Sequence, residues 1–277
     1  MTSLVKPVAS CILAVYNAES TILPCIESLI GQSTPVEIII VDDGSSDRTM
    51  QKLSIYKNIK ILKQSHGGPA LARNLGSSHA TTDILLFVDS DMVFDRDYVN
   101  TLISPITTGK VIGTYSTNEK VANWENVWAR CWNIEEGWED GIRFPANPPE
   151  FGTDFRAILK SEFDRVGGFD HIGYTDTWSL FKKLNIKPLA TPALCFHKNP
   201  GSLTAVFRQA RWAAKRPYKY GILGTLYALV RTTLPISLLV GLAKSARNTR
   251  FLIFKIIYDL GRFVGIIEMI TTGKLAK

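Results

Sequence analysis

The chain has 277 residues and 30.8 kDa, enough for one large domain or one domain with an appendage. Hydrophobic residues make up 45% of it and its four cysteines show no CxxC spacing, which excludes a disordered chain and argues against a disulfide framework or a zinc site. The net charge of +7 is uneven, because residues 198–277 carry +12 and residues 1–197 carry −5. Basic residues among long apolar runs favour an anionic membrane surface over nucleic acid as a partner, although a basic helical subdomain with an ordinary core would show the same composition.

The first 115 residues alternate short apolar runs with helical patterns. They predict strands at 10–16, 36–41, 59–63, 84–88 and 111–115, and helices at 20–31, 47–55, 69–79 and 97–106. Continuous apolar strands that alternate with helices indicate a mainly parallel sheet covered on both faces. The first strand begins so close to the N-terminus that we expect no signal peptide and a cytoplasmic protein.

Polar residues follow three of the predicted strands. Tyr16 ends the first, Asp42 and Asp43 follow the second, and Asp89 and Asp91 follow the fourth. Ligands bind at the carboxyl ends of strands in such sheets, so these residues are expected to form one crevice. Because the sequence has neither GxxxxGK[ST] nor GxGxxG, a bound nucleotide would be held through carboxylates and a metal.

Five stretches, in order, resemble a family-2 glycosyltransferase with the GT-A fold. They read SCILAVYNAE, VEIIIVDDGSSDRT, GGPALARNLG, ILLFVDSDM and VGGFDHIGYTDTWSLFKKL. The resemblance covers about the first 200 residues. It implies a Rossmann-like mixed α/β sheet and an inverting, nucleotide-sugar-dependent hexosyltransferase.

The resemblance also implies where the donor binds. Its nucleotide sugar would contact Tyr16, Asp42, Asp43, Arg73, Asp89 and Asp91. In this reading Asp91 ligates a divalent cation, Mn²⁺ or Mg²⁺, which prefers oxygen ligands and stabilises the charge of a leaving diphosphate. Asp89 would contact the ribose or the metal shell. A lone arginine such as Arg73 is also consistent with a helix-surface charge.

The second half of the chain supplies candidates for the transfer step. The family carries Glu-Asp where this chain has Thr175 and Asp176, and Asp176 is the candidate general base for an acceptor hydroxyl. Asp176 would also cap the helix that follows; Asp154 and Asp170 are weaker alternatives. His197, after an apolar strand-like run, is either a further metal ligand or a structural histidine.

An RQARW segment resembles the QxxRW motif of polysaccharide-synthesising relatives, with Arg208 in the place of the leading glutamine. The resemblance implies that Trp212 stacks on an acceptor sugar and that Arg208 and Arg211 approach the pyrophosphate. A basic helix turn with a core tryptophan is the competing interpretation. Three tryptophans at every fourth residue, from 124 to 132, predict a helical stripe that is typical of a core, with acceptor or membrane contact as a secondary role.

The predicted organisation is a glycosyltransferase domain at 1–215 and a basic, apolar helical tail at 216–277. The first domain divides into a nucleotide-binding half at 1–115 and an acceptor half at 116–215. In the tail, Arg231 interrupts the first apolar segment, and Lys255, Asp259 and Arg262 share one face of a helix at 251–267. This pattern favours a helix lying at the membrane interface with its apolar face in lipid. Packing onto the catalytic domain or a second subunit would give the same pattern, and a re-entrant hairpin or a spanning segment stays open.

The sequence therefore predicts an inverting glycosyltransferase that passes a sugar from a nucleotide-sugar donor to a lipid-linked or glycan acceptor. We expect it to be peripherally attached to the cytoplasmic face of a membrane, with no nucleic-acid partner. The alternatives are a polyprenyl-phosphate sugar synthase, whose phosphate acceptor needs no base, and a non-catalytic membrane scaffold that binds sugar nucleotides. The motifs do not specify the donor, the acceptor or the oligomeric state.

Overall fold

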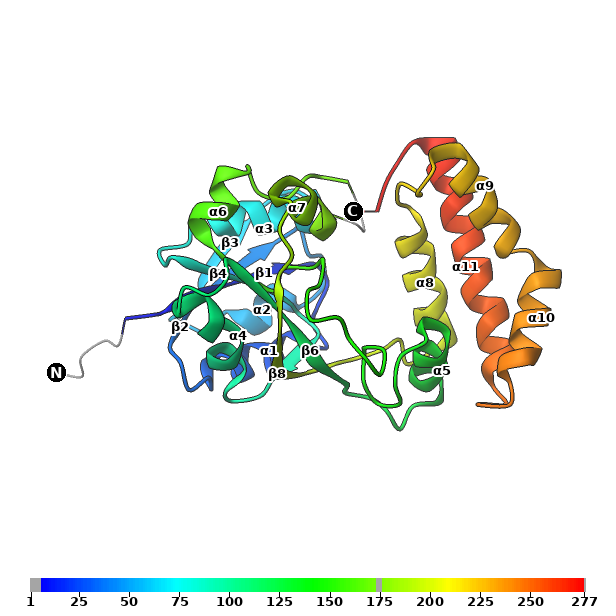
Figure 1. Cartoon of the computed structure of the whole chain (residues 1–277), viewed down its shortest axis with the longest axis horizontal. Coiled ribbons are helices and arrows are strands. Elements are labelled where there is room, and N and C mark those ends of the chain that lie inside the picture. Colours follow the sequence, from blue (N-terminus) through cyan, green and yellow to red (C-terminus); the bar gives the residue numbers. More distant parts are fainter. Residues whose placement is uncertain (1–5, 173–175, 277) are drawn as a thin grey trace. The chain divides into compact units, whose positions relative to one another are not determined.

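The computed structural model describes residues 6–172 and 176–276, without the side chain of Asp176. Contacts within the chain define two compact units. The sheet unit comprises residues 6–120, 147–171 and 176–197, and the helical unit comprises residues 121–146, 172 and 198–276. Both units are therefore assembled from segments that are not contiguous in the sequence (Figure 1).

An eight-stranded mixed sheet forms the centre of the sheet unit, in the order β3-β2-β1-β4-β7-β6-β8-β5. Its strands are β1 Ala9–Val15, β2 Val36–Asp42, β3 Lys60–Lys63, β4 Ile84–Asp89, β5 Met92–Phe94, β6 Gly113–Val121, β7 Ala157–Leu159 and β8 Leu189–His197. The first four strands of this order are parallel, and β7 pairs antiparallel with both β4 and β6. The five strands predicted in the first 115 residues are observed, and the first four of them form the parallel half of a mixed sheet. The fifth, β6, pairs antiparallel with β7, and the short β5 was not predicted.

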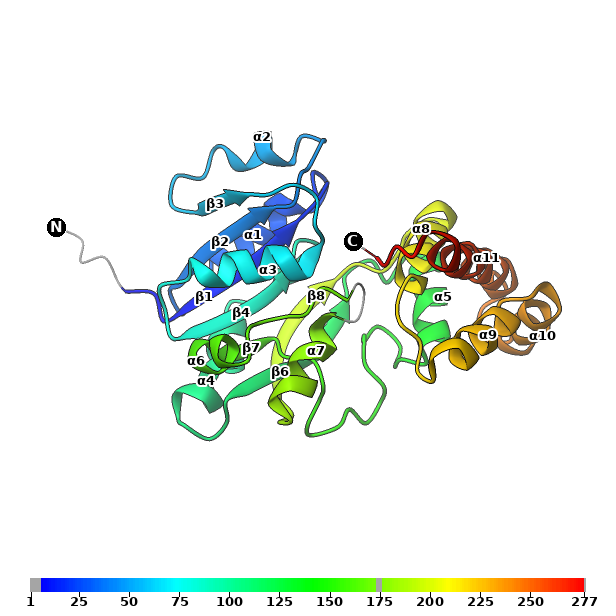
Figure 2. The same cartoon turned by 90° about the horizontal axis from the view of Figure 1, so that it is seen from above.

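Helices cover both faces of this sheet, as the apolar strands require (Figure 2). They are α1 Ile22–Ile30, α2 Thr49–Leu53, α3 Pro69–Ser78, α4 Tyr98–Thr107, α6 Lys160–Arg165 and α7 Asp176–Leu184. Successive side chains of β1 alternate between the faces. Cys11 and Leu13 join the core cluster with α1 and α4, while Ile12 joins the cluster with α3, α6 and α7. The helix α3 lies close to β1, because a Cβ at Gly76 would be 2.5 Å from the Ile12 side chain.

The helical unit contains α5 Val127–Glu136, α8 Leu203–Ala214, α9 Gly221–Arg231, α10 Leu234–Lys244 and α11 Phe251–Thr272. The long helix α11 packs along α8 and α10 (Figure 1). Two glycines one turn apart permit the close approach to α8, since a Cβ at Gly265 would be 2.1 Å from the Arg211 carbonyl oxygen and one at Gly261 2.6 Å from that of Phe207. In the structure α8, which the sequence analysis placed in a domain at 1–215, thus packs with the helices of the tail.

The tryptophan stripe contributes to the core of this helical unit. Trp132 on α5 is buried and makes edge-to-face contacts with Phe254 and Tyr258 of α11. Trp128, one turn earlier on α5, is partly buried in the same cluster, while Trp124 precedes the helix. The core role expected for the stripe is therefore observed for the two tryptophans on α5.

The charged face of α11 points inward. Lys255 and Asp259 are only 3% and 1% exposed, and Lys255 Nζ lies 2.6 Å from Glu135 Oε1 of α5 and 3.1 Å from Asp259 Oδ1. The Ser237 hydroxyl of α10 donates to the other oxygen of Asp259 over 2.8 Å. This face therefore packs inside the helical unit, where α5 and α10 supply its polar partners, and the spacing of its charges does not by itself indicate a membrane interface.

Large apolar side chains are instead exposed on the outer helices. Among the described residues, no single helix is long and apolar enough to cross a membrane. The pair α9 and α10, which is bent by 64° at a short break, passes that test by length and composition only. Ile222 of α9 and Leu239 of α10 are 80% and 70% exposed.

Candidate active site

Three of the predicted residue clusters meet at one edge of the sheet. In the parallel register of β1, Val15 lies opposite Asp42 of β2, and Ala14 lies opposite Asp89 of β4. Tyr16 follows the last residue of β1. The carboxyl ends of these strands therefore bring Tyr16, Asp42 and Asp89 to the same side of the sheet unit, as expected for a ligand crevice.

Asp43 organises the loop that leads into α3. Its side chain is buried, Oδ1 accepts hydrogen bonds from Gln64 Nε2 and Gly67 N, and Oδ2 accepts from Gly68 N over 2.9 Å and contacts His66 Nδ1 over 2.9 Å. Gly68 has a φ of 96°, which favours glycine at this position. Asp43 thus fixes the start of α3 and the position of His66.

An aromatic platform lies beside this loop. The Tyr16 and His66 rings stack with centroids 4.2 Å apart and an interplanar angle of 24°, and Tyr16 is 48% exposed. Asp42 accepts from Ser45 N over 2.9 Å, and Asn17 Oδ1 accepts from the backbone of Ser46. The exposed face of Tyr16 is suited to a planar ring such as a nucleobase.

Two arginines bind the Asp89 carboxylate. Arg73 of α3 donates to Oδ1 over 3.0 Å, and Arg156, which precedes β7, donates to Oδ2 over 2.9 Å. Burial by itself would raise the pKa of the Asp89 carboxyl, but Arg156 and Arg73 hold that pKa well below its usual range. Asp89 therefore stays ionised, and its rotamer is fixed from two sides.

Asp91, two residues after Asp89 in the sequence, contacts His197, and His197 contacts Glu119. His197 Nε2 lies 3.2 Å from Asp91 Oδ1, and His197 Nδ1 lies 2.7 Å from Glu119 Oε1. The pairing of Met92 in β5 with His197 in β8 brings the two segments together. If Nδ1 carries the proton and donates to Glu119, the lone pair of Nε2 is directed to the Asp91 side.

This arrangement fits a divalent cation bound by Asp91 and His197. Two ligand atoms 3.2 Å apart can share one cation, and a carboxylate that accepts from the far ring nitrogen is the usual support of a metal-bound histidine. Within residues 6–172 and 176–276, no group of three or more His, Cys, Asp or Glu side chains is arranged as a metal site. The remaining ligands would come from phosphate oxygens and water, as Mg²⁺ sites at substrate phosphates generally do.

The structure places the predicted acceptor residues in other elements. Asp176 begins α7, but its side chain and the whole of Thr175 lie outside the described residues. Arg208, Arg211 and Trp212 lie on α8 in the helical unit, where Arg211 Nε donates to Glu268 Oε2 over 3.0 Å. Their roles toward an acceptor stay predictions.

The two weaker base candidates differ in their surroundings. Asp170 lies 2.5 Å from Lys183 Nζ of α7, and its backbone N–H donates to Ser179 Oγ. These contacts give Asp170 a structural role at the start of α7. Asp154 lies near Arg156 and raises the pKa of that guanidinium together with Asp89 and Glu119, against the lowering effect of burial.

Sequence reasoning missed Glu119, Arg156 and His66. Arg156 precedes the buried strand Ala157–Leu159, and a lone arginine beside a short apolar run is a weak signal of a buried ion pair. Glu119 sits near the end of β6 in a polar segment, and nothing local distinguishes it from a surface residue. Glu119 and Arg156 lie at the site because β6 and β7, the strands that carry or adjoin them, pair antiparallel beside β4.

Comparisons with known proteins show which sequences resemble this chain. The chain is 32% identical over 136 residues to the minor teichoic acid biosynthesis protein GgaA of Bacillus subtilis strain 168, a match that covers 40% of this chain and 30% of GgaA. It is 36% identical over 99 residues to the poly(ribitol-phosphate) beta-N-acetylglucosaminyltransferase TarS of Staphylococcus aureus strain Mu50, covering 33% of this chain and 16% of TarS. The matches thus span less than a third of these relatives.

Solved structures show the same fold at low sequence identity. A crystal structure of residues 1–349 of S. aureus TarS in complex with UDP-GlcNAc superposes with a TM-score of 0.58 at 14% identity, covering 98% of this chain and 93% of that chain. The mannosyltransferase PcManGT of Pyrobaculum calidifontis, in complex with GDP-Man and Mn²⁺, gives 0.59 at 16% identity and covers 98% and 89%. The sequence model of glycosyl transferase family 2 matches residues 10–168, more than half of the chain. The chain therefore belongs to glycosyl transferase family 2 and is a transferase enzyme with the GT-A fold.

Proposed function

We propose that the chain transfers a sugar with inversion from a nucleotide-sugar donor to a lipid-linked or glycan acceptor, and that a divalent metal assists the reaction. One observation carries this proposal. The Asp91–His197–Glu119 chain lies next to the arginine-bound Asp89, at the edge of the sheet where Tyr16 offers an exposed ring. This is the set of groups needed to bind a base, a ribose and a diphosphate in one crevice.

The nucleoside part of the donor would bind at the ends of β1 and β2. Tyr16 would stack on the base, while His66 supports the back of its ring. Asp42 would accept from the base edge, and Asp43, whose oxygens already receive loop donors, would act by holding that loop. Asp89 would accept from a ribose hydroxyl, because Arg73 and Arg156 keep its carboxylate charged and oriented.

Asp91 and His197 would hold the metal, with Glu119 fixing the histidine tautomer. When bound, Mn²⁺ or Mg²⁺ supplies positive charge that stabilises the diphosphate as it leaves. The contribution of the chain is to orient the two ligands before the donor arrives. Arg156, which lies 3.8 Å from Glu119 and is bonded to Asp89, ties the ribose and metal ends of the site to each other.

Asp176 would act as general base. A carboxylate that removes the proton from an acceptor hydroxyl as the hydroxyl attacks the anomeric carbon raises the rate of direct displacement. Displacement from the side opposite the leaving group inverts the anomeric configuration. The position of Asp176 at the first residue of α7 supports this role, since a helix N-terminus favours the charged form of a carboxylate.

We place this reaction at the cytoplasmic face of a membrane. The basic composition of residues 198–276 and the exposed apolar side chains of α9 and α10 support attachment there. A membrane location would give the enzyme access to an acceptor carried on a lipid. Peripheral attachment requires no helix that crosses the bilayer.

A binding experiment tests the donor site. Titration calorimetry with a panel of nucleoside diphosphates and nucleotide sugars should show one nucleoside that binds at least about tenfold tighter with Mn²⁺ than without it. Asp91→Asn should remove that dependence, and Asp95→Asn, an exposed aspartate four residues later, should keep it. Metal-independent binding in the wild type would contradict the metal site. Tight donor binding with no release of nucleoside diphosphate to any acceptor would instead support the non-catalytic scaffold.

A further inference from the structure

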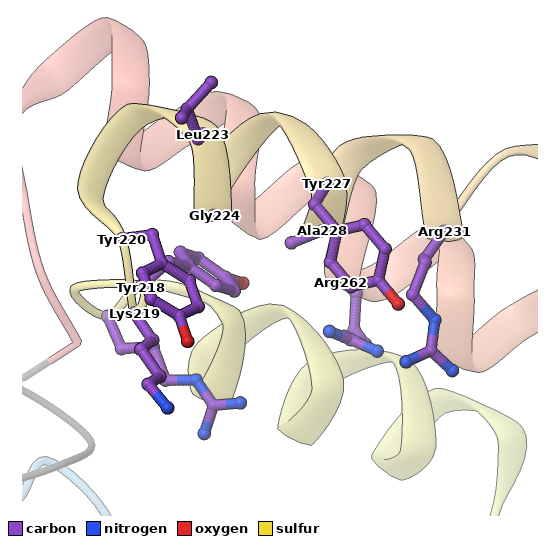
Figure 3. A pocket seen from close by; sticks show the side chains of 10 residues that line it. Tyr218, Lys219, Tyr220, Leu223, Gly224, Tyr227, Ala228, Arg231 and Arg262 are labelled. Carbon is purple, nitrogen blue, oxygen red and sulfur yellow. The ribbon is translucent and has the colours of Figure 1, made fainter.

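The helical unit contains a pocket that the donor site does not use. It has a volume of about 660 Å³ and lies between the loop that joins α8 to α9, the length of α9 and the middle of α11 (Figure 3). Four of the residues that line it are basic and three are tyrosines: Arg216, Lys219, Arg231, Arg262, Tyr218, Tyr220 and Tyr227. Such a lining suits a ligand with concentrated negative charge.

Few acidic residues of the helical unit lie near the cations at 219, 231 and 262. From residue 198 onward the sequence has only two acidic residues, Asp259 and Glu268. Asp259 is bonded to Lys255 and Ser237, and Glu268 to Arg211 and Lys215. Among the described residues, no carboxylate lies within ion-pair distance of Lys219, Arg231 or Arg262. Glu136 of α5 acts on the pocket from a longer distance, through electrostatic interaction with Arg262 and Arg216.

Aromatic rings hold the basic groups around the pocket. The Lys219 ammonium lies 5.0 Å from the centroid of the Tyr220 ring, and the Arg231 guanidinium carbon lies 5.8 Å from that of Tyr227. Cation–π contacts of this kind orient a basic side chain while leaving its N–H groups able to bind an anion. In Figure 3 the arginines at 231 and 262 extend from two different helices toward the same side of the pocket.

The first turn of α9 borders the pocket. Tyr220 has a φ of 69°, a left-handed conformation, and no side chain caps the helix that starts at Gly221. Gly224 lies so close to the preceding loop that a Cβ would be 1.8 Å from the Lys219 carbonyl oxygen. The loop and the first turn of α9 therefore form one wall of the pocket, to which Tyr220, Leu223 and Gly224 contribute.

An apolar surface adjoins this basic pocket. Leu223 and Tyr227 line the pocket and are at the same time exposed, together with further side chains of α9 and α10: Ile222, Leu226, Val230, Leu234, Leu238, Leu239 and Leu242. Large apolar side chains gathered on the outside of two neighbouring helices are typical of a surface that meets a partner or a membrane. Cations at the edge of an apolar helix face are the arrangement by which peripheral helices bind anionic lipids.

We propose that this pocket binds the phosphate of a membrane lipid phosphomonoester or diphosphate, while the exposed faces of α9 and α10 lie in the lipid layer. The inference rests on the part of the proposed function that brings the chain to a membrane. Four basic groups match a phosphomonoester, which carries a charge of about −1.5 to −2, better than the single charge of a phosphodiester headgroup. The lipid chain would leave the pocket over Leu223 onto the apolar surface.

Vesicle co-sedimentation of the full chain tests the proposal. Vesicles of phosphatidylcholine would carry either phosphatidic acid, a monoester, or phosphatidylglycerol, a diester, at matched surface charge. The wild type should bind the monoester vesicles more tightly. Lys219→Gln with Arg231→Gln, both exposed positions, should weaken that binding by about 30-fold, from about fivefold for each basic residue at the surface.

A matched double variant separates the pocket from general basicity. Arg250→Gln with Lys274→Gln removes the same charge from exposed positions of the helical unit outside the pocket, and should change binding by less than about threefold. An equal loss in both double variants, or no preference for the monoester, would overturn the proposal. Displacement of the lipid by equimolar inorganic pyrophosphate would do the same, because it would identify a site for free anions.

Two further readouts keep the outcome unambiguous. Donor binding measured by calorimetry should be unchanged in both double variants, so failure of the lipid site with intact donor binding counts against the pocket and leaves the donor assignment standing. Sedimentation velocity without lipid should show no self-association through α9 and α10. A dimer that Leu239→Ser dissociates would overturn the lipid assignment and identify the apolar face as a contact between copies.

Discussion

Replacing Glu119 by glutamine should weaken metal binding although Glu119 would not touch the metal. Glu119 is buried, and its Oε1 lies 2.7 Å from His197 Nδ1. Glutamine keeps the size of the side chain but offers a neutral carbonyl or an N–H in place of a carboxylate, so the Nδ1–H tautomer loses its charged acceptor. Loss of such an outer partner costs about 10- to 100-fold in metal affinity. We expect the Mn²⁺ dissociation constant, measured with saturating nucleoside diphosphate, to rise by about that factor.

The assay is Mn²⁺ titration followed by electron paramagnetic resonance of the free ion. Glu37→Gln is the matched control, because Glu37 lies near the opposite end of β2 and bonds Ser10 and Thr81 far from Asp91. Both variants should unfold at similar denaturant concentrations. A Mn²⁺ affinity in Glu119→Gln within twofold of the wild type would refute the argument that Glu119 orients His197 as a ligand.

Three further predictions concern the candidate base Asp176, the arginine-bound Asp89 and the contact between α8 and α11. Asp176→Asn should lower the rate of sugar transfer by at least about 100-fold, while calorimetry still detects donor binding. Transfer at the wild-type rate would show that Asp176 is not the general base. Asp89→Asn should cost about 2 kcal/mol of unfolding free energy at pH 7, because it removes the carboxylate that Arg73 and Arg156 share. Arg156 and Arg73 lower the Asp89 pKa in the folded protein. The stability that the ionised Asp89 contributes is therefore complete above the unfolded pKa of about 3.9, and it is lost as pH falls from there through the lower folded pKa. The free energies of unfolding of the wild type and Asp89→Asn, measured by urea denaturation, should accordingly become more similar as the pH is lowered. Gly265→Ala, whose Cβ would meet the α8 backbone at 2.1 Å, should lower the melting temperature. Gly273→Ala would meet no atom within 4 Å and should cost less, since it adds only the strain of a side chain at a φ of 66°.

The local pattern of the sequence was sufficient for one half of the site. The first four apolar runs of the chain became parallel strands, and the central ones are apolar throughout because helices cover both faces of the sheet. Once the strands are parallel, the polar residues after them must meet at one edge. Tyr16, Asp42 and Asp89 could therefore be placed together from their positions after the strands, and the register of β1 confirms that placement.

The other half depended on pairings that no local signal encodes. The strand β5 has three residues, and it exists as a strand because Met92–Phe94 pairs antiparallel with β8. Arg156 reaches Asp89 across 67 positions of the chain, and Glu119 reaches His197 across 78. A lone glutamate and a lone arginine look like surface charges in sequence. Their burial follows only from the order of the antiparallel strands.

The tail shows why periodicity predicts a shared face but not the direction of that face. The spacing of Lys255 and Asp259 placed both on one side of α11, and the structure turns that side inward, where Glu135 and Lys244 complete the cluster. Two lysines and two carboxylates balance, so the buried cluster carries no net charge and its desolvation cost is offset by close pairing. Lys255 and Asp259 are buried inside the helical unit, whereas large apolar side chains of α9 and α10 are exposed on its surface. Exposed to water alone that surface would be unfavourable, whereas at a lipid interface both the inner charges and the outer apolar groups are in the surroundings that stabilise them.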